Sequence, residues 1–394
     1  MSFRTSRSGR LRLGGAAAAS VLLLAIAACG GSDSDASSDG PIRIGLFTPL
    51  AAAVGGFGQP AADGAKLAVS EINAAGGIDG RQVELAVQDN GCTSTNGASA
   101  VESLLGDDPV AIIGGLCSDS TLAALPLVER AGVPLLIDLA SNPEITKQAG
   151  EDGNKWIFRW GPNDDVTAVS AVTNLAQLGT VRTIALVTSD DSFGQGGRTA
   201  ITDAAKNAGI TIVSDDAMNL NDPDFAAVVA RIGTKKPDAV VLWLNSGSQV
   251  ANFYQQYGAA GLQSVPIAGQ LDMAQLSSST KALKGYNSAA YSASVDTPQN
   301  QAYLKAWEAN GGTTANAYVG WDGYQSVQIL AAALRAADEI SPKGVREALK
   351  NLTYSPTIVG GTIKFDQNHQ AHDKIVVEEF SESGAKTAVR LLDQ

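Results

Sequence analysis

The sequence predicts an α/β protein built from two lobes, each with a parallel β-sheet. Eight short apolar runs rich in Val, Ile and Leu alternate with segments of helical periodicity. Continuous apolar runs are typical of strands that are covered on both faces, and regular strand–helix alternation favours parallel sheets made of βαβ units. The 394 residues exceed what one hydrophobic core usually serves, so we expect two lobes.

The predicted elements follow in chain order from residue 42. The first sheet is expected to contain the runs IRIGLF, VELAVQD, VAIIGG and VPLLID, with helices at 64–75, 97–105 and 122–130. The second is expected to contain IALVTS, ITIVSD, AVVLWL and VPIAG, with helices at 165–178, 195–208, 225–232, 248–257 and 273–283. The stretch KWIFRWGPNDD between them is aromatic and then turn-forming, so the chain is expected to pass between the lobes there. Helices at 299–310 and 323–337 precede a predicted hairpin in GGTIKFDQNHQAHDKIVVEEF.

Residues 1–28 are expected to be a secretory signal peptide. A basic segment with four arginines precedes an apolar stretch at 14–28, which is too short to span a membrane. The stretch ends in Ile-Ala-Ala-Cys, which resembles a bacterial lipobox and predicts lipidation of Cys29. An ordinary signal peptide with an incidental cysteine is the alternative. Residues 29–40 are expected to form a flexible tether, so the protein would be lipid-anchored at the outer face of the cytoplasmic membrane.

The charge balance excludes several kinds of partner. The formal net charge is −12 and the chain has no basic run, which argues against binding to nucleic acid or to an anionic membrane surface. No segment after the signal peptide contains about 18 uninterrupted apolar residues, so membrane contact is expected through the lipid anchor only. We expect a monomer.

Two further cysteines, Cys92 and Cys117, follow neighbouring predicted strands. The carboxyl ends of neighbouring parallel strands lie at one edge of a sheet, so this pair is placed to form a disulfide in an oxidising compartment. A catalytic Cys117 would need a histidine base, but His369 and His372 both lie in a late polar loop. We expect that loop to be exposed and to bind no metal. The sequence therefore predicts neither an enzyme nor a metal site.

A glycine-rich motif opens the first helix. Residues 56–61 fit G-x-G-x-x-A, which read alone is a dinucleotide fingerprint. The preceding loop is too long for the tight turn of that fingerprint, and Asp89 lies too far along the chain to serve a ribose. We therefore predict no cofactor. What remains is a loop of free amides with Phe57 at its tip.

Polar residues follow the strands of both predicted sheets at their carboxyl ends, where open parallel sheets bind ligands. Residues 118–120 begin a helix, and either helix capping or binding of a ligand carboxylate explains them. Ser141 follows the next strand. In the second lobe, Asn245 and Asp272 end two strands, and Phe193 lies where a helix opens. Their recurrence predicts a ligand site between the lobes.

Together these features resemble the type I periplasmic binding proteins, specifically the leucine/isoleucine/valine-binding branch that serves ABC transporters. The resemblance covers residues 41–394 and rests on INAAGGIDGR, GGLCSDST, ASNPEIT, DDSFGQG and the separation of Cys92 from Cys117. It implies two Rossmann-like lobes joined by three crossovers, with the ligand enclosed between them. The implied N-terminal lobe is 41–159 plus 292–356, and the implied C-terminal lobe is 160–291 plus 357–394.

The resemblance also implies particular ligand contacts from the N-terminal lobe. Ser118 and Ser141, with the backbone at Leu139 and Ala140, are expected to hold the carboxylate and ammonium of a ligand. Phe57 falls where the family places an aromatic ring against the ligand side chain.

In the C-terminal lobe the chain departs from the family pattern. Phe193 stands where a tyrosine is usual, and Asn245 and Ser246 stand where an aromatic residue is common. Leu271 aligns with the acid that meets a ligand ammonium, and Asp272 is its neighbour.

We therefore expect an extracytoplasmic substrate-binding lipoprotein of an ABC importer. Its ligand would be a small carboxylate-bearing solute, first a branched-chain or other apolar amino acid, and its other partner a permease. Two alternatives remain open: an amide, urea-like or aromatic carboxylate ligand, and a sensory ligand-binding module of the same fold.

Overall fold

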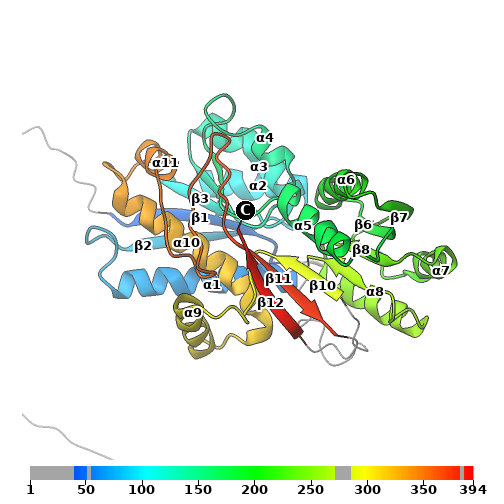
Figure 1. Cartoon of the computed structure of the whole chain (residues 1–394). Helices are drawn as coiled ribbons and strands as arrows, with labels where there is room; N and C mark the ends of the chain where they lie inside the picture. The colour runs from blue at the N-terminus through cyan, green and yellow to red at the C-terminus, as the bar shows by residue number, and fades with distance from the viewer. Residues whose placement is uncertain (1–39, 51–54, 271–284, 382–385, 394) are drawn as a thin grey trace, which may run out of the picture. The chain divides into compact units, whose positions relative to one another are not determined.

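Two β-sheets organise the computed structural model, which describes residues 40–50, 55–270, 285–381 and 386–393 (Figure 1). The first sheet has the order β2-β1-β3-β4-β5, and all of its strands are parallel. Its strands are β1 (Ile42–Thr48), β2 (Val83–Asp89), β3 (Ala111–Gly114), β4 (Leu135–Ile137) and β5 (Ile157–Arg159). The sequence predicted the first four, and β5 lies in the stretch that it assigned to a crossing between lobes.

The second sheet has the order β12-β11-β10-β9-β8-β6-β7. It is parallel from β7 to β10 and antiparallel from β10 to β12. Its strands are β6 (Thr183–Ser189), β7 (Thr211–Met218), β8 (Ala239–Trp243), β9 (Ile267–Gly269), β10 (Gly285–Ala289), β11 (Ile375–Phe380) and β12 (Lys386–Leu392). The predicted late hairpin is wrong, because the segment around Phe365 makes only isolated bridges and β11 pairs with β10 and β12.

Helices α1 to α11 connect these strands. Side chains of Thr93, Asp191, Ser246, Thr297 and Ser341 cap five of them by accepting a backbone N–H of the first turn. The helices are α1 (Gly55–Ala74), α2 (Ser94–Leu105), α3 (Ser118–Ala131), α4 (Glu144–Lys147), α5 (Asp164–Gln177), α6 (Ser192–Asn207), α7 (Ala226–Lys235), α8 (Gly247–Ala259), α9 (Pro298–Ala309), α10 (Ala317–Ala336) and α11 (Pro342–Lys350). Within the described part of the chain, no helix has the length and apolar character needed to cross a membrane.

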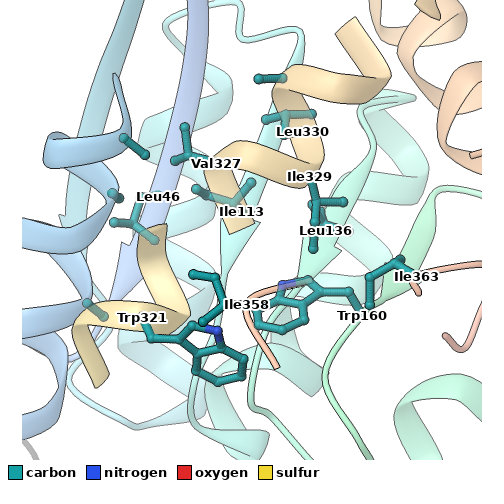
Figure 2. Close-up of a cluster of buried hydrophobic side chains, with 14 of the residues drawn as sticks. Leu46, Ile113, Leu136, Trp160, Trp321, Val327, Ile329, Leu330, Ile358 and Ile363 are labelled. Atoms are coloured by element: carbon teal, nitrogen blue, oxygen red, sulfur yellow. The ribbon is translucent and has the colours of Figure 1, made fainter. Parts of the chain in front are cut away.

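Helix α10 covers the first sheet, although it lies late in the sequence. It runs beside α1 (Figure 1), and a Cβ on Gly64 of α1 would lie only 1.8 Å from the carbonyl oxygen of Gly320 on α10. The glycines therefore let the two backbones approach closely. Figure 2 shows side chains of α10 among residues of the first sheet and of later segments: Leu46, Ile113, Leu136, Trp160, Trp321, Val327, Ile329, Leu330, Ile358 and Ile363.

The chain passes between the two sheets three times, as the fold class requires. The passages lie between β5 and α5, between β10 and α9, and between α11 and β11. In the last of them Phe365 packs edge-on against Phe158 of β5, with ring centroids 5.2 Å apart. Ile358 and Ile363 also join the core of the first sheet. The third segment thus stays with the first sheet beyond residue 356, where the sequence placed the boundary.

His369 corrects a second expectation. The sequence predicted an exposed loop, but His369 is 2% exposed and stacks on Phe158 with ring centroids 4.2 Å apart. Its Nδ1 lies 2.9 Å from the carbonyl oxygen of Ile157, and burial lowers its pKa. His372 is exposed, as predicted. His369 is therefore a packed core residue of the segment that forms the third passage.

Candidate ligand-binding site

A pocket lies where loops of the first sheet meet loops of the second. The cavity itself measures about 60 Å³, and the space that also includes open solvent measures about 490 Å³. The first sheet and its helices contribute Phe57, Leu116, Leu139, Tyr318 and Val319, and the second contributes Phe193, Leu244, Asn245 and Gln270. The structure thus brings together four residues that the sequence named: Phe57, Leu139, Phe193 and Asn245.

The chemistry of this lining is apolar and aromatic. Three rings and four aliphatic side chains surround the space, and its polar side chains are the neutral Asn245, Gln270 and Tyr318. No charged side chain is among the described residues of the lining. Small-molecule sites commonly combine such a lining with a few placed polar groups. The pocket therefore suits an apolar or aromatic group.

Two phenylalanines are held in place from opposite sides. A Cβ on Gly247, the first residue of α8, would lie 3.1 Å from Cζ of Phe57, so the ring of α1 reaches the start of α8. Phe193 of α6 stacks on Trp243 of β8, with centroids 5.9 Å apart and 9° between the ring planes. The first turns of α1 and α6 thus each present a ring to the same pocket.

Asn245 is oriented by a hydrogen bond rather than by packing. Its Nδ2 donates to Oδ2 of Asp191 at 2.5 Å. The other oxygen of Asp191 accepts the backbone N–H of Gly194 at 2.9 Å and caps α6. The carboxamide therefore has a fixed direction at the pocket, because a helix cap holds its partner.

The two serines predicted to face the ligand lie outside this lining. Ser118 is 1% exposed and its Oγ accepts the N–H of Asn142 at 3.3 Å, while Ser141 is fully buried. Ala140 is buried as well, and its carbonyl accepts from Arg159 Nη1 at 3.0 Å. The Oγ of Ser141 has no hydrogen-bond partner among the described residues.

The start of α3 also differs from the prediction. Cys117, not Ser118 or Ser120, occupies the cap position and makes no side-chain cap bond. The Oγ of Ser120 donates to the carbonyl of Cys117 at 2.9 Å. Asp119 instead accepts a hydrogen bond from Ser192 at the start of α6. The first turns of α3 and α6 therefore contact each other.

Cys92 and Cys117 form a disulfide with 5.3 Å between their Cα atoms. Both are buried, and the bond joins the segments that follow β2 and β3. Nδ2 of Asn245 lies 3.8 Å from the sulfur of Cys92. The bond thus lies next to the pocket.

A buried acid, Asp164, lies at the first passage between the sheets. Burial raises its pKa to about 7, while the hydroxyl of Ser141, the charge of Arg159 and the indole N–H of Trp243 favour the charged form. Neither Ser141 nor Trp243 reaches the geometry of a full hydrogen bond to the carboxyl. The backbone N–H of Asp164 donates to the carbonyl of Ser141 at 3.0 Å.

The comparisons with known proteins agree with this fold of two sheets. The model of the family described as periplasmic binding protein matches residues 41–385. The chain belongs to this family. Members of this family are extracytoplasmic solute-binding proteins.

Two curated relatives of this periplasmic binding protein carry amino-acid names. The leucine-, isoleucine-, valine-, threonine- and alanine-binding protein of Pseudomonas aeruginosa is 26% identical over 383 residues, covering 93% of this chain and 97% of the relative. The Leu/Ile/Val-binding protein of Escherichia coli (strain K12) is 25% identical over 329 residues, covering 83% and 87%.

Solved structures show the same fold with different ligands. A solute binding protein from Rhodopseudomonas palustris in complex with 3,4-dihydroxybenzoic acid has a TM-score of 0.79 at 20% identity, covering 90% of this chain and 98% of its own. A branched-chain amino acid transporter substrate binding protein from Streptococcus pneumoniae in complex with isoleucine has a TM-score of 0.78 at 23% identity, covering 90% and 100%.

Several predicted residues of this periplasmic binding protein lie outside the described residues. They lie in residues 1–39, with Cys29 and all of the tether except Gly40, and in residues 271–284, with Leu271, Asp272 and the predicted helix at 273–283. Among the residues that the structure describes, no group of three or more His, Cys, Asp or Glu side chains is arranged to hold a metal ion.

Sequence reasoning missed two acids that adjoin the pocket. Asp138 ends the run VPLLID and Asp322 lies inside the apolar helix α10. Burial raises the pKa of both carboxyls. A lone acid within an apolar stretch was the available signal, because burying a carboxyl without a partner is costly.

Proposed function

We propose that this protein is the solute receptor of an ABC importer and that it binds a small apolar amino acid, a branched-chain one first. The observation that carries the proposal is the pocket, in which apolar and aromatic side chains from both sheets surround one space. The names of the curated relatives support the same ligand class.

The proposed ligand lies with its side chain between Phe57 and Phe193 and its polar end toward Asn245 and Gln270. An amino acid also brings an ammonium, and burying that charge without a partner costs several kcal/mol. We propose Asp272 as its partner, because this residue follows β9 and Gln270 directly. Ser118 and Ser141 remain the proposed partners of the ligand carboxylate.

An aromatic carboxylate is the second candidate ligand. The three rings of Phe57, Phe193 and Tyr318 and the neutral polar groups favour it, since a benzoate needs ring contacts and has no ammonium to neutralise. An aromatic ligand would leave Asp272 without a role in binding.

A ligand panel tests the proposal. Thermal unfolding of the mature protein is measured with each common amino acid and with benzoate and 4-hydroxybenzoate. A ligand at about a hundred times its Kd stabilises by about 2.7 kcal/mol, so the melting temperature should rise with leucine, isoleucine or valine. Asp272→Ala should lose that rise and keep the unliganded melting temperature. A rise with benzoates alone would support the second candidate, and no response to any compound would contradict both.

Anchoring and delivery to a permease are separate parts of the proposal. Cys29 is proposed to carry the lipid, so Cys29→Ser should move the protein from the membrane fraction to the soluble fraction with its fold intact. Retention in the membrane after signal cleavage would contradict the anchor.

Copurification experiments test delivery to a permease. Copurification with a permease supports transport, and copurification with a signalling protein instead would support the sensory alternative.

A further inference from the structure

Asp138 and Asp322 form a buried carboxyl pair behind the pocket wall. Asp138 is 1% exposed and Asp322 is fully buried. Oδ1 of Asp138 accepts the backbone N–H of Leu116 at 2.8 Å and of Leu139 at 2.6 Å. Both leucines line the pocket. One carboxyl therefore holds two wall residues that come from the ends of different strands.

The second acid connects this wall to α10. Asp322 lies one helical turn after Tyr318, and Tyr318 and Val319 line the pocket from α10. The pair thus joins the two sides of the wall that the first sheet and its covering helix supply. Leu116 needs such support, because its φ of 53° lies in the left-handed region, which disfavours a residue with a Cβ.

The pair needs one proton. The carboxyl of Asp322 receives no hydrogen bond from a donor group among the described residues. The acid that acts on it is Asp138, which is buried as well. Two carboxyls bond to each other only when one of them keeps its proton. Burial raises the pKa of both acids, and the charge of Asp138 raises that of Asp322 further.

The surroundings offer no cation to replace that proton. Neither acid takes part in an ion pair within the described residues. Asp322 also acts on Tyr303 of α9, whose pKa is raised by burial and by neighbouring groups that include this acid. Deprotonation would therefore place two negative charges face to face behind the wall.

We propose that the Asp138–Asp322 pair positions the ligand pocket: with one shared proton it fixes Leu116 and Leu139 against α10, and loss of the proton loosens this wall and weakens ligand binding. The inference rests on the proposed function only in taking the pocket as the ligand site. The acids are positioning residues, since neither lines the pocket.

The sign of the pH dependence follows from the raised pKa values. The folded protein binds more protons at this pair than the unfolded chain does. The stabilisation is therefore complete at low pH and is lost as the pH rises through the titration of the pair. Ligand affinity should follow the same course, because the wall that it depends on loosens in the same range.

Amide variants test the shared proton. In Asp322→Asn or Asp138→Asn an amide N–H replaces that proton, and one carboxylate remains to accept it. Titration with leucine, and with benzoate as a second probe, should show that the affinity of wild type falls with rising pH. The affinity of either variant should stay near the low-pH value of wild type. The same fall in wild type and in both variants would overturn the proposal.

A second variant tests the positioning itself. Asp138→Leu removes the acceptor of the Leu116 and Leu139 amides, so affinity should lie roughly tenfold below the low-pH value of wild type. Hydrogen exchange of those two amides should also become faster. Unchanged affinity and unchanged exchange would overturn the proposal.

Asp373→Asn provides the matched control. Asp373 is a buried acid whose pKa burial raises to about 6, and its partners are Thr357 and the N–H of Lys374, away from the pocket. The control should alter the pH dependence of stability without altering that of affinity. If neither probe binds wild type, the proposed ligands are wrong, and amide exchange and stability against pH in the variants still decide the role of the pair.

Discussion

Phe57 shows how a single side chain can join distant parts of this chain. It belongs to α1, it lies against Gly247 at the start of α8, and it lines the pocket. It is only partly buried, so the fold does not depend on it as the core does. Its contribution should therefore appear in binding rather than in stability.

We predict that Phe57→Ala weakens ligand binding by about 2 kcal/mol, because the ligand loses the apolar area that the ring covers. Unfolding in denaturant should change little. Leu178→Ala, at a large apolar side chain that is 39% exposed and outside the pocket lining, serves as control. Calorimetric titration that finds equal affinity in Phe57→Ala and wild type would contradict this role.

The sequence identified some pocket residues and missed others for a physical reason. Phe193 and Asn245 lie where strands end and helices begin, so their positions alone indicated an edge of a sheet. Tyr318 lies in the first turn of α10, ahead of the helix predicted at 323–337, so the sequence pattern did not mark it as part of a helix start. Ser118 follows β3, as predicted, but it is 1% exposed and lies outside the described lining, because position along a strand does not determine which neighbours surround a side chain.

At the level of elements, the disulfide between Cys92 and Cys117 closes a loop at the edge of the first sheet. Replacing both cysteines by serine should lower the free energy of unfolding by about 3.5 kcal/mol, the chain-entropy value for their separation of 25 residues. Denaturant unfolding of the oxidised protein and of the double variant measures the difference. The bond would be ruled out if the double variant were as stable as wild type and peptide mapping found both cysteines of wild type as free thiols.

The close approach of α1 and α10 gives a second prediction at this level. Gly64→Ala should destabilise the fold by about 2 kcal/mol, because the added methyl group meets the backbone of Gly320. Gly233→Ala in α7 is the matched control, since its nearest neighbour would be 3.9 Å away. The control should gain up to about 1 kcal/mol from helix propensity. Equal changes in the two variants would contradict the contact.

Short strands explain most of the errors in the elements. Strand β5 has three residues within an aromatic stretch, and its identity comes from pairing with β4. The segment around Phe365 looked like a strand locally, but it packs on β5 and leaves β11 to pair with β12. Strands such as β1 and β8 were predictable because a strand that is buried on both faces has a continuous run of apolar residues.

For the molecule as a whole, Asp164 links pH to stability at the first passage between the sheets. Its pKa of about 7 lies above the ordinary value of 3.8, so the folded state holds a proton that the unfolded chain releases. Its contribution to stability is complete at low pH and is lost as the pH rises from about 4 through about 7. Arg159 nearby is fully buried, and burial lowers its pKa to about 10.

Asp164→Asn should remove this part of the pH dependence. The free energy of unfolding of wild type, relative to the variant, should fall between about pH 4 and pH 8. Denaturant unfolding at several pH values measures the curve for each protein. Parallel curves over this range would show that Asp164 titrates alike in the folded and unfolded chains.

The hydrophobic core of the first sheet also determines when this chain can complete its fold during synthesis. That core joins β1, from the start of the described chain, to α10 and to Ile363 near the end. Domains that are contiguous in sequence begin to fold while the ribosome is still working. Here the sheet face that α10 covers stays bare until most of the polypeptide has emerged. Completion of the fold therefore waits until most of the polypeptide has been synthesised.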